Sequence, residues 1–346
     1  MPFVIRYSLV TSNYREFANK TVCDIDTMGA SSGNQVRDMD DTRSAASGES
    51  AAATETKAVL MIGKDPDVKG ELSQLLMPEG WTIHESRDPE EALVLVEEYP
   101  IDLVVTSRAT SGKEDVELLR RIRRANAHTR VIILTDESTP EDVIASMREH
   151  AFGYLSKRFS EESLADTIRH ILETPAWDDG IEVMSATPQL ITLAVRCQIV
   201  TAERLLQFLG EITDLPESEC RDVGIAFREM LLNAMEHGGK FDPTKYVEVC
   251  YVRTKHVLMG RIKDPGDGFT LEEVRHAAIA NPPDDPLAHV KRRNDEGMRP
   301  GGYGVMLAKN LVDELIYGEK GNEVLLVKYL PGYESGAPKH LADSHS

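Results

Sequence analysis

The stretch AFREMLLNAMEHGG, residues 226–239, sets Glu229, Asn233 and His237 four residues apart. In an α-helix this spacing places the three polar side chains along one stripe. Apolar side chains cover most of the remaining helix surface: Phe227, Met230, Leu231, Leu232, Ala234 and Met235. We therefore expect a packed helix whose polar stripe faces a cavity, although a solvated surface helix accounts equally well for this stripe taken alone.

The three polar residues have complementary chemistry. Asn233 offers an amide oxygen, a hard ligand suited to Mg²⁺. Because Mg²⁺ keeps several waters and also binds substrate phosphates, one protein oxygen is enough. Glu229, one turn earlier, suits a general base that polarises a hydroxyl or a water in phosphoryl transfer. His237, one turn later, suits a hydrogen bond to a phosphate or to a lid.

A second motif, DPGDGF (264–269), follows a run that alternates like two strands with a turn near Thr254. A carboxylate at the end of a strand accepts a hydrogen bond from an exocyclic amine, so Asp264 suits the amino group of adenine. Gly266 and Gly268 allow positive φ and the close approach of a ring. Asp-Pro-Gly is also ordinary turn chemistry, which explains the motif if it stands alone.

A third motif, RPGGYGVMLAKNLVDE (299–314), is a glycine-rich loop that runs into an amphipathic helix. Backbone amides at a helix N-terminus form an anion site when nearby glycines let a phosphate approach. Arg299 adds positive charge before the glycines, which are Gly301, Gly302 and Gly304. The long polar segment 270–298 that precedes this motif is expected to be a nucleotide lid.

The order of the three motifs resembles the GHKL ATPases, the superfamily that includes the histidine kinases. Within it, the chain looks most like the anti-sigma factor serine/threonine kinases of the RsbW and SpoIIAB type. The compact domain, N-A-x-x-H-G at 233–238 and the segment Leu193–Leu209 favour that subgroup. The resemblance covers roughly residues 181–330, within a domain expected at 181–332. One departure is Val305, which stands where the family usually has leucine.

The resemblance implies a role for each motif residue, with ATP and Mg²⁺ as cofactors. Glu229 is the implied catalytic base, Asn233 the implied Mg²⁺ ligand and Asp264 the implied adenine contact. The implied glycines of the nucleotide loops are Gly266, Gly268, Gly302 and Gly304. The resemblance also implies a STAS-domain anti-sigma antagonist as substrate, a sigma factor as a further partner, and a homodimer.

Upstream, residues 57–175 alternate short apolar strands with helical stretches, which predicts a parallel doubly wound sheet. The strands at 58–62, 102–106 and 131–135 are continuously apolar, as buried parallel strands are. The run from VLMIGKDPDV (59–68) to GYLSKRF (153–159) resembles a response-regulator receiver domain, the CheY-like fold. The fold class is therefore an α/β receiver-like domain followed by an α+β GHKL (Bergerat) sandwich.

The receiver resemblance fails at its phosphorylation chemistry. Thr135 and Lys157 match the family, but the acidic pair falls on Gly63 and Lys64, and the acceptor aspartate falls on Ser107; Asp65 lies one position beyond the pair. Mg²⁺ needs carboxylate oxygens, and a serine hydroxyl is not the carboxylate that forms an acyl phosphate. We predict a pseudo-receiver that serves as a docking or dimerisation module.

Composition sets the remaining bounds. At 346 residues the chain has room for two to three domains. A net charge of −19 argues against nonspecific nucleic-acid binding, and no apolar run is long enough to span a bilayer. We expect a cytoplasmic protein, a mostly disordered extension at 1–56 with its start at Met1 or Met28, and a polar tail at 333–346.

Two functional hypotheses follow from these patterns. The first is a serine/threonine kinase of the anti-sigma type that phosphorylates a STAS partner, with the pseudo-receiver as its docking domain. The alternative is a non-catalytic ATP-binding adaptor that sequesters a sigma factor or another regulator. Turnover of ATP distinguishes the two.

Overall fold

The computed structural model describes residues 57–106, 112–156, 161–173, 180–213, 215–268, 291, 295 and 303–332. All of them belong to the second of two units of the chain, Glu55–Ser346. The predictions for the extension 1–56, for the tail 333–346 and for most of the lid segment 270–298 lie outside the described residues. None of the described helices combines the length and apolar character needed to cross a membrane.

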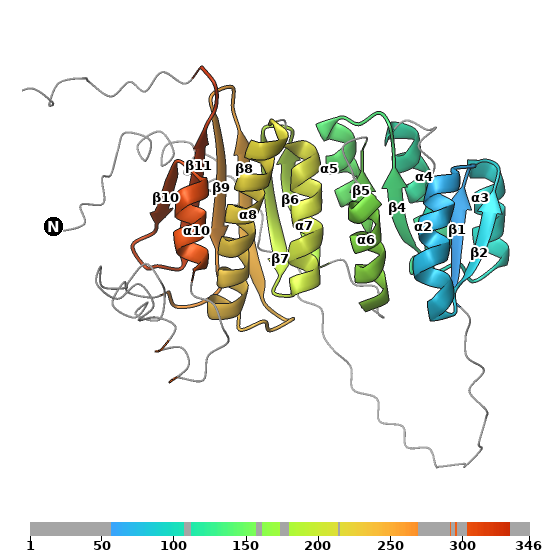
Figure 1. The fold of residues 1–346 in the computed structure, drawn as a ribbon, viewed down its shortest axis with the longest axis horizontal. Coiled ribbons are helices and arrows are strands. Elements are labelled where there is room, and N and C mark those ends of the chain that lie inside the picture. The colour runs from blue at the N-terminus through green and yellow to red at the C-terminus, as the bar shows by residue number, and fades with distance from the viewer. Residues whose placement is uncertain are drawn as a thin grey trace, which may run out of the picture. The chain divides into compact units, whose positions relative to one another are not determined.

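The first sheet is parallel and five-stranded, in the order β2-β1-β3-β4-β5 (Figure 1). Its strands are β1 (Ala58–Ile62), β2 (Thr82–Ser86), β3 (Leu103–Val105), β4 (Arg130–Leu134) and β5 (Gly153–Leu155). Every residue of β1, β3, β4 and β5 is buried, as expected of strands covered on both faces. The predicted doubly wound sheet is confirmed.

Helices cover both faces of this sheet. The helices are α2 (Pro66–Leu76), α3 (Pro89–Glu98), α4 (Gly112–Ala125), α5 (Pro140–Arg148) and α6 (Glu161–Glu173), with a 3-10 turn, η1, at Met77–Glu79. Helices α2 and α6 contact each other on one face, whereas α3, α4 and α5 follow one another on the other. Three of these helices begin at proline after an aspartate or threonine cap, a start that the missing proline N–H favours.

The second sheet is antiparallel and six-stranded, in the order β10-β11-β9-β8-β7-β6. Its strands are β6 (Ile181–Thr187), β7 (Leu190–Arg196), β8 (Tyr246–Arg253), β9 (Val257–Lys263), β10 (Glu314–Tyr317) and β11 (Glu323–Tyr329). Helices α7 (Ile199–Ile212), α8 (Glu217–Asn233) and α10 (Gly304–Leu311) lie together on one face (Figure 1). Burial alternates along β7, β8 and β9, so each of these strands turns one row of side chains toward these helices.

The helix of the opening motif does not continue as a regular α-helix. It ends at Asn233, and Ala234–Gly238 form a single π-turn, η2, closed by a hydrogen bond from the Gly239 N–H to the Ala234 carbonyl. The predicted helix therefore changes from α to π geometry after Asn233, and His237 lies in this π-turn. A π-turn carries more residues per turn, and such turns are frequent at functional sites.

Helix α7 joins the two sheets into one structure. One cluster of buried apolar side chains includes Ile133 of β4, Met147 of α5, Phe208 of α7 and Leu231 of α8. A second cluster fills the space between the first sheet and helices α2 and α6. The first cluster therefore extends from the parallel sheet to the antiparallel sheet.

Candidate functional site

Helices α8 and α10 bring the first and third sequence motifs together. Gly304 is the first residue of α10, and a Cβ added there would lie 2.6 Å from Oε2 of Glu229 and 3.5 Å from Nδ2 of Asn233. Both polar side chains of the α8 stripe therefore face the N-terminal turn of α10, and only a glycine leaves room between them. Backbone amides of such a turn offer an anion site.

The second motif meets the π-turn. Asp264 follows β9, and a Cβ added at Gly238 would overlap the Asp264 carboxylate. The Gly266 N–H donates to Oδ1 of Asp264 at 2.8 Å, and the Asp264 N–H donates to the carbonyl of Asn322 at 2.9 Å. Gly238 is thus the residue that lets the end of β9 approach the π-turn. Sequence reasoning did not assign it a site role, although it completes the N-A-x-x-H-G pattern.

Burial changes the acid–base behaviour of Asp264. Desolvation raises the pKa of its carboxyl above the usual value of 3.8, and the hydrogen bond from the Gly266 N–H opposes this rise. Because one carboxylate oxygen already accepts from Gly266, the other remains to accept from a ligand amine. This arrangement suits the recognition of an adenine amino group.

Gly268 needs its left-handed conformation. Its φ is +87°, and a Cβ there would overlap the Lys320 carbonyl oxygen in the turn between β10 and β11. The Asn322 side-chain amide donates to the Gly266 carbonyl at 3.3 Å, which ties the same turn to the Asp264 loop. Both glycines of the DPGDGF motif therefore lie where the loop contacts a neighbouring turn.

The remaining residues of the predicted nucleotide site do not belong to the groups around Gly304 and Asp264. His237 is exposed and lies in the π-turn that follows Asn233. Arg299, Gly301 and Gly302 lie outside the described residues. The structure therefore brings Glu229, Asn233 and Gly304 together, and groups Asp264 with Gly266.

Two residues beside Glu229 were not identified from the sequence. Arg228 donates from Nε and Nη2 to Oε1 of Glu203 in α7, at 2.9 and 2.6 Å. Its Nη1 lies 3.7 Å from Oε1 of Glu229. The hydrogen bond to Glu203 also raises the pKa of Arg228, so this guanidinium is a fixed positive charge beside the proposed base. No sequence signal links Glu203 to Arg228, because the pair depends on how α7 packs against α8.

The pseudo-receiver pocket lies at the carboxyl ends of the parallel strands, where ligands bind in this fold. Gly63 follows β1 with φ of +86° and donates to the Ser86 carbonyl at 2.9 Å, and Lys64 beside it is exposed. The Asp65 carboxylate caps α2 by accepting from the Asp67 and Val68 N–H groups, both at 3.2 Å. Asp65 is therefore committed to a structural role.

Thr135 completes the described part of this pocket. Its Oγ1 donates to the Glu137 carbonyl at 2.8 Å and accepts from the Glu137 N–H at 3.2 Å. Ser107 and Lys157 lie outside the described residues. Among the pocket positions that the structure describes, Asp65 supplies the only carboxylate, and its Oδ1 accepts both hydrogen bonds of the helix cap.

Comparisons with known proteins agree with the two folds. Residues 59–169 match the family model of the response regulator receiver domain, and residues 193–328 match that of the histidine kinase-like ATPase domain. The chain therefore contains a receiver domain followed by an ATPase domain of the GHKL class, which supports a role in signal transduction. These matches do not separate the RsbW type from other members of the class.

Several curated relatives are transcriptional regulatory proteins. TrcR of Mycobacterium tuberculosis is 27% identical over 135 residues, which cover 37% of this chain and 52% of TrcR. CpxR of Escherichia coli (strain K12) is 29% identical over 121 residues, which cover 35% of this chain and 51% of CpxR. The chain thus spans about half the length of the curated relatives it matches.

Solved structures of receiver domains also match part of the chain. One match is the signal receiver domain of an HD domain-containing protein from Pseudomonas fluorescens Pf-5, which is 28% identical with a TM-score of 0.30. The match covers 34% of this chain and 96% of the receiver-domain chain. A CheY-like receiver domain protein from Methanospirillum hungatei JF-1 is 21% identical, with a TM-score of 0.31, and covers 34% of this chain and 95% of that one.

Proposed function

We propose that this chain is an ATP-dependent serine/threonine kinase of the anti-sigma type that acts on a STAS-domain partner in the cytoplasm. The observation that supports this most directly is the meeting of Glu229 and Asn233 with Gly304 at the first turn of α10. A base, a magnesium ligand and an anion-binding helix end are the parts that phosphoryl transfer needs. Asp264 adds an acceptor suited to adenine.

The residues present fit a nucleotide with magnesium. When bound, Mg²⁺ neutralises charge on the phosphates, and the protein's own part is to position and to accept a proton. Asn233 would hold the ion through its amide oxygen, and the first amides of α10 would hold phosphate oxygens. Glu229 would accept the proton of the attacking serine hydroxyl, and Asp264 would orient the base through its second carboxylate oxygen.

The receiver domain has no comparable chemistry in this proposal. Gly63 and Lys64 supply no carboxylate for a metal, and Asp65 caps a helix. It acts as a docking domain for partners, among which a sigma factor and a second copy of the chain are proposed. This lost chemistry also favours the second candidate, an adaptor that binds ATP without turning it over.

Calorimetry with Mg·ATP tests the nucleotide site directly. We expect magnesium-dependent binding to the full chain that Asn233→Ala abolishes. Asn310→Ala, which removes an exposed amide from α10, is the matched control and should bind as the wild type does. Absence of binding to the wild type would overturn the kinase and favour an adaptor that binds its partner without nucleotide.

Transfer to protein then separates the kinase from the adaptor. We expect labelled phosphate from γ-labelled ATP to reach a serine of a STAS-domain protein, in a form stable to acid. Glu229→Gln should retain nucleotide binding while it loses transfer by about two orders of magnitude or more. Tight binding of ATP with no ADP released by the wild type would instead establish the adaptor.

A further inference from the structure

Arg228 lies between two carboxylates that compete for it. Its guanidinium donates twice to Glu203, at 2.9 and 2.6 Å, and approaches Glu229 to 3.7 Å, beyond hydrogen-bond distance. The side chains of Glu203, Glu229 and Arg228 are 23%, 30% and 42% exposed, so water screens these attractions only in part. Glu203 thus holds the guanidinium by two hydrogen bonds and leaves the Glu229 carboxylate outside them.

Release of Arg228 from Glu203 would change the state of Glu229. An arginine fork satisfies a carboxylate through paired, charge-assisted hydrogen bonds. A carboxylate held in that way is a poorer proton acceptor, because accepting the proton would break those bonds. The Glu203–Arg228 pair therefore limits Glu229 to an ion pair at 3.7 Å and keeps its carboxylate out of hydrogen bonds with Arg228.

Glu203 lies on α7, and the receiver domain holds the neighbouring face of that helix. The side chains of Arg204, Gln207 and Glu211 recur at helical spacing on that face. Arg204 donates to the carbonyls of Ala151 and Phe152, both at 2.9 Å, where the chain enters β5. One arginine of α7 thus contacts the parallel sheet while its neighbour Glu203 contacts the ATPase helix α8.

The other two side chains extend this contact along β5 and α6. Gln207 donates to Oγ1 of Thr167 in α6 at 2.8 Å. Glu211 accepts from the Ser156 N–H at 3.2 Å, at the end of β5 and directly before Lys157 of the predicted receiver pocket. Helix α7 is therefore fixed to both ends of β5.

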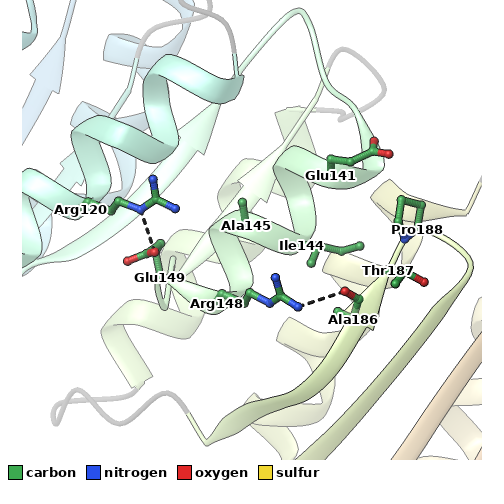
Figure 2. Close-up of a pocket in the computed structure, with 9 residues that line it drawn as sticks. All are labelled: Arg120, Glu141, Ile144, Ala145, Arg148, Glu149, Ala186, Thr187 and Pro188. Atoms are coloured by element: carbon green, nitrogen blue, oxygen red, sulfur yellow. Dashed lines mark hydrogen bonds and ion pairs between the residues drawn. The ribbon is translucent and has the colours of Figure 1, made fainter. Parts of the chain in front are cut away.

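A second contact between the domains lies between α5 and the end of β6. Arg148 donates to the Ala186 carbonyl at 3.0 Å, and the same region contains a half-open pocket of about 200 Å³ lined by Arg120, Ile144 and Pro188 among others (Figure 2). Glu149 at its rim is engaged by Arg120 at 2.8 Å. The receiver domain is thus held at two separate places on the ATPase domain.

We propose that Glu203 and Arg228 are positioning residues for Glu229, and that the receiver domain controls them by setting the position of α7. A partner that moves the receiver domain would shift Glu203 away from Arg228, and the guanidinium would then close its 3.7 Å ion pair with Glu229 to a hydrogen-bonded fork and stop turnover. This inference rests on the proposed function, because it assigns the regulation of the same site.

The test measures ADP release by the full chain at saturating Mg·ATP, with the STAS-domain protein as phosphate acceptor, together with Mg·ATP affinity by calorimetry. Glu203→Gln removes the charge that holds Arg228 and should lower kcat by about tenfold, with affinity changed less than about threefold. Arg228→Gln and the double variant should turn over at the same rate, since residue 203 matters only while Arg228 is present. Arg221→Gln on the same helix, which breaks only an exposed pair with Glu217, is the control.

Gly153→Ala tests the receiver side of the connection. A Cβ at Gly153 of β5 would lie 3.2 Å from Oε1 of Gln207 and 3.0 Å from Cγ2 of Thr167. The added methyl group would therefore crowd the side chain of Gln207 in α7. We expect it to lower kcat in the presence of Arg228 and to have no effect in the Arg228→Gln background. Unfolding temperatures of all variants check that they fold, and Glu203→Ala, which also removes the charge, replaces Glu203→Gln if the latter does not.

The outcomes separate the inference from the proposed function. A wild type that turns over, with Glu203→Gln equally fast or with the double variant as slow as Glu203→Gln, overturns the positioning role alone. An unchanged rate in Gly153→Ala overturns the control by the receiver domain. A wild type that neither binds Mg·ATP nor releases ADP overturns the proposed function and this inference with it.

Discussion

The guanidinium of Arg204 in α7 lies 4.8 Å from the ring centroid of Phe152 and donates to the Phe152 carbonyl at 2.9 Å. Arg130 of β4 approaches the same ring to 5.6 Å. Arg204 is only 3% exposed, so its charge is satisfied by backbone carbonyls and by the face of the ring. A helix of the ATPase domain is thereby anchored in the receiver domain.

Removal of this anchor should destabilise the whole described unit. Arg204→Ala leaves two buried carbonyls without their donor, which we expect to lower the free energy of unfolding by roughly 2–3 kcal/mol. Urea denaturation measures this loss. Arg221→Ala, which removes only an exposed pair, should change it by less than about 0.5 kcal/mol, and equal losses in the two variants would contradict the anchoring role.

Two glycine substitutions should act in opposite directions on stability. Gly268→Ala meets a positive φ and overlaps the Lys320 carbonyl, so we expect a loss of roughly 1–3 kcal/mol. Gly224→Ala, inside α8 with nothing within 4 Å of the added Cβ, should gain about 0.5–1 kcal/mol from helix propensity. Thermal and urea unfolding compare the two. A neutral Gly268→Ala would show that the loop relaxes around the added methyl group.

Gly304→Ala should weaken nucleotide binding without destabilising the fold. The added methyl lies 2.6 Å from Glu229 Oε2, so it fills the gap between the α8 stripe and the first turn of α10. We expect the affinity for Mg·ATP to fall by about tenfold or more, equivalent to about 1.4 kcal/mol, while the unfolding midpoint stays near that of the wild type. Calorimetry and thermal unfolding on the same samples check both, and unaltered affinity would place the nucleotide elsewhere.

Asp264→Asn should weaken ATP binding and yet stabilise the protein at neutral pH. The Asn oxygen keeps the bond from the Gly266 N–H, but its amide then presents a donor toward the adenine amino group. Burial raises the pKa of the Asp264 carboxyl in the folded protein above its usual value of 3.8. At pH values between the unfolded and the folded pKa, the folded protein therefore binds more protons than the unfolded chain. This carboxyl therefore favours folding below its unfolded pKa, and that contribution is lost as pH rises through the folded pKa.

The pH dependence of this stability difference is measured by denaturing the wild type and Asp264→Asn at several pH values. The stability of Asp264→Asn minus that of the wild type should be near zero below about pH 3.8 and positive at pH 7. The affinity for Mg·ATP should fall by about tenfold or more. A stability difference that grows toward low pH would contradict the assigned direction of the pKa.

The receiver domain should not accept phosphate from a small-molecule donor. With Gly63 and Lys64 in place of an acidic pair and Asp65 committed to capping α2, the pocket lacks the ligands for Mg²⁺. Incubation with acetyl phosphate and Mg²⁺ should leave the intact mass unchanged, while a receiver with its acidic pair gains a phosphate under the same conditions. A base-labile phosphate on residues 57–175 would contradict this prediction.

Short-range patterns predicted most of the fold. Buried parallel strands are continuously apolar, so β1 and β4 were recognisable as stretches of sequence. The alternation in β8 and β9 identified an antiparallel pair with a turn at Thr254 for the same reason, since one face of each strand meets the helices. The spacing of Glu229 and Asn233 was enough to place them on one face of α8.

The sequence by itself determined the fold class, the order of the domains and the residue types suited to a nucleotide site, because these depend on local periodicity and motif spacing. Only the tertiary structure decided that α8 ends in a π-turn and that the Asp264 carboxylate packs against Gly238. It alone also decided that Glu203 hydrogen-bonds to Arg228 beside Glu229. These contacts join residues far apart in sequence or depend on how two helices pack. Their geometry follows from side-chain packing in three dimensions, which no local pattern encodes.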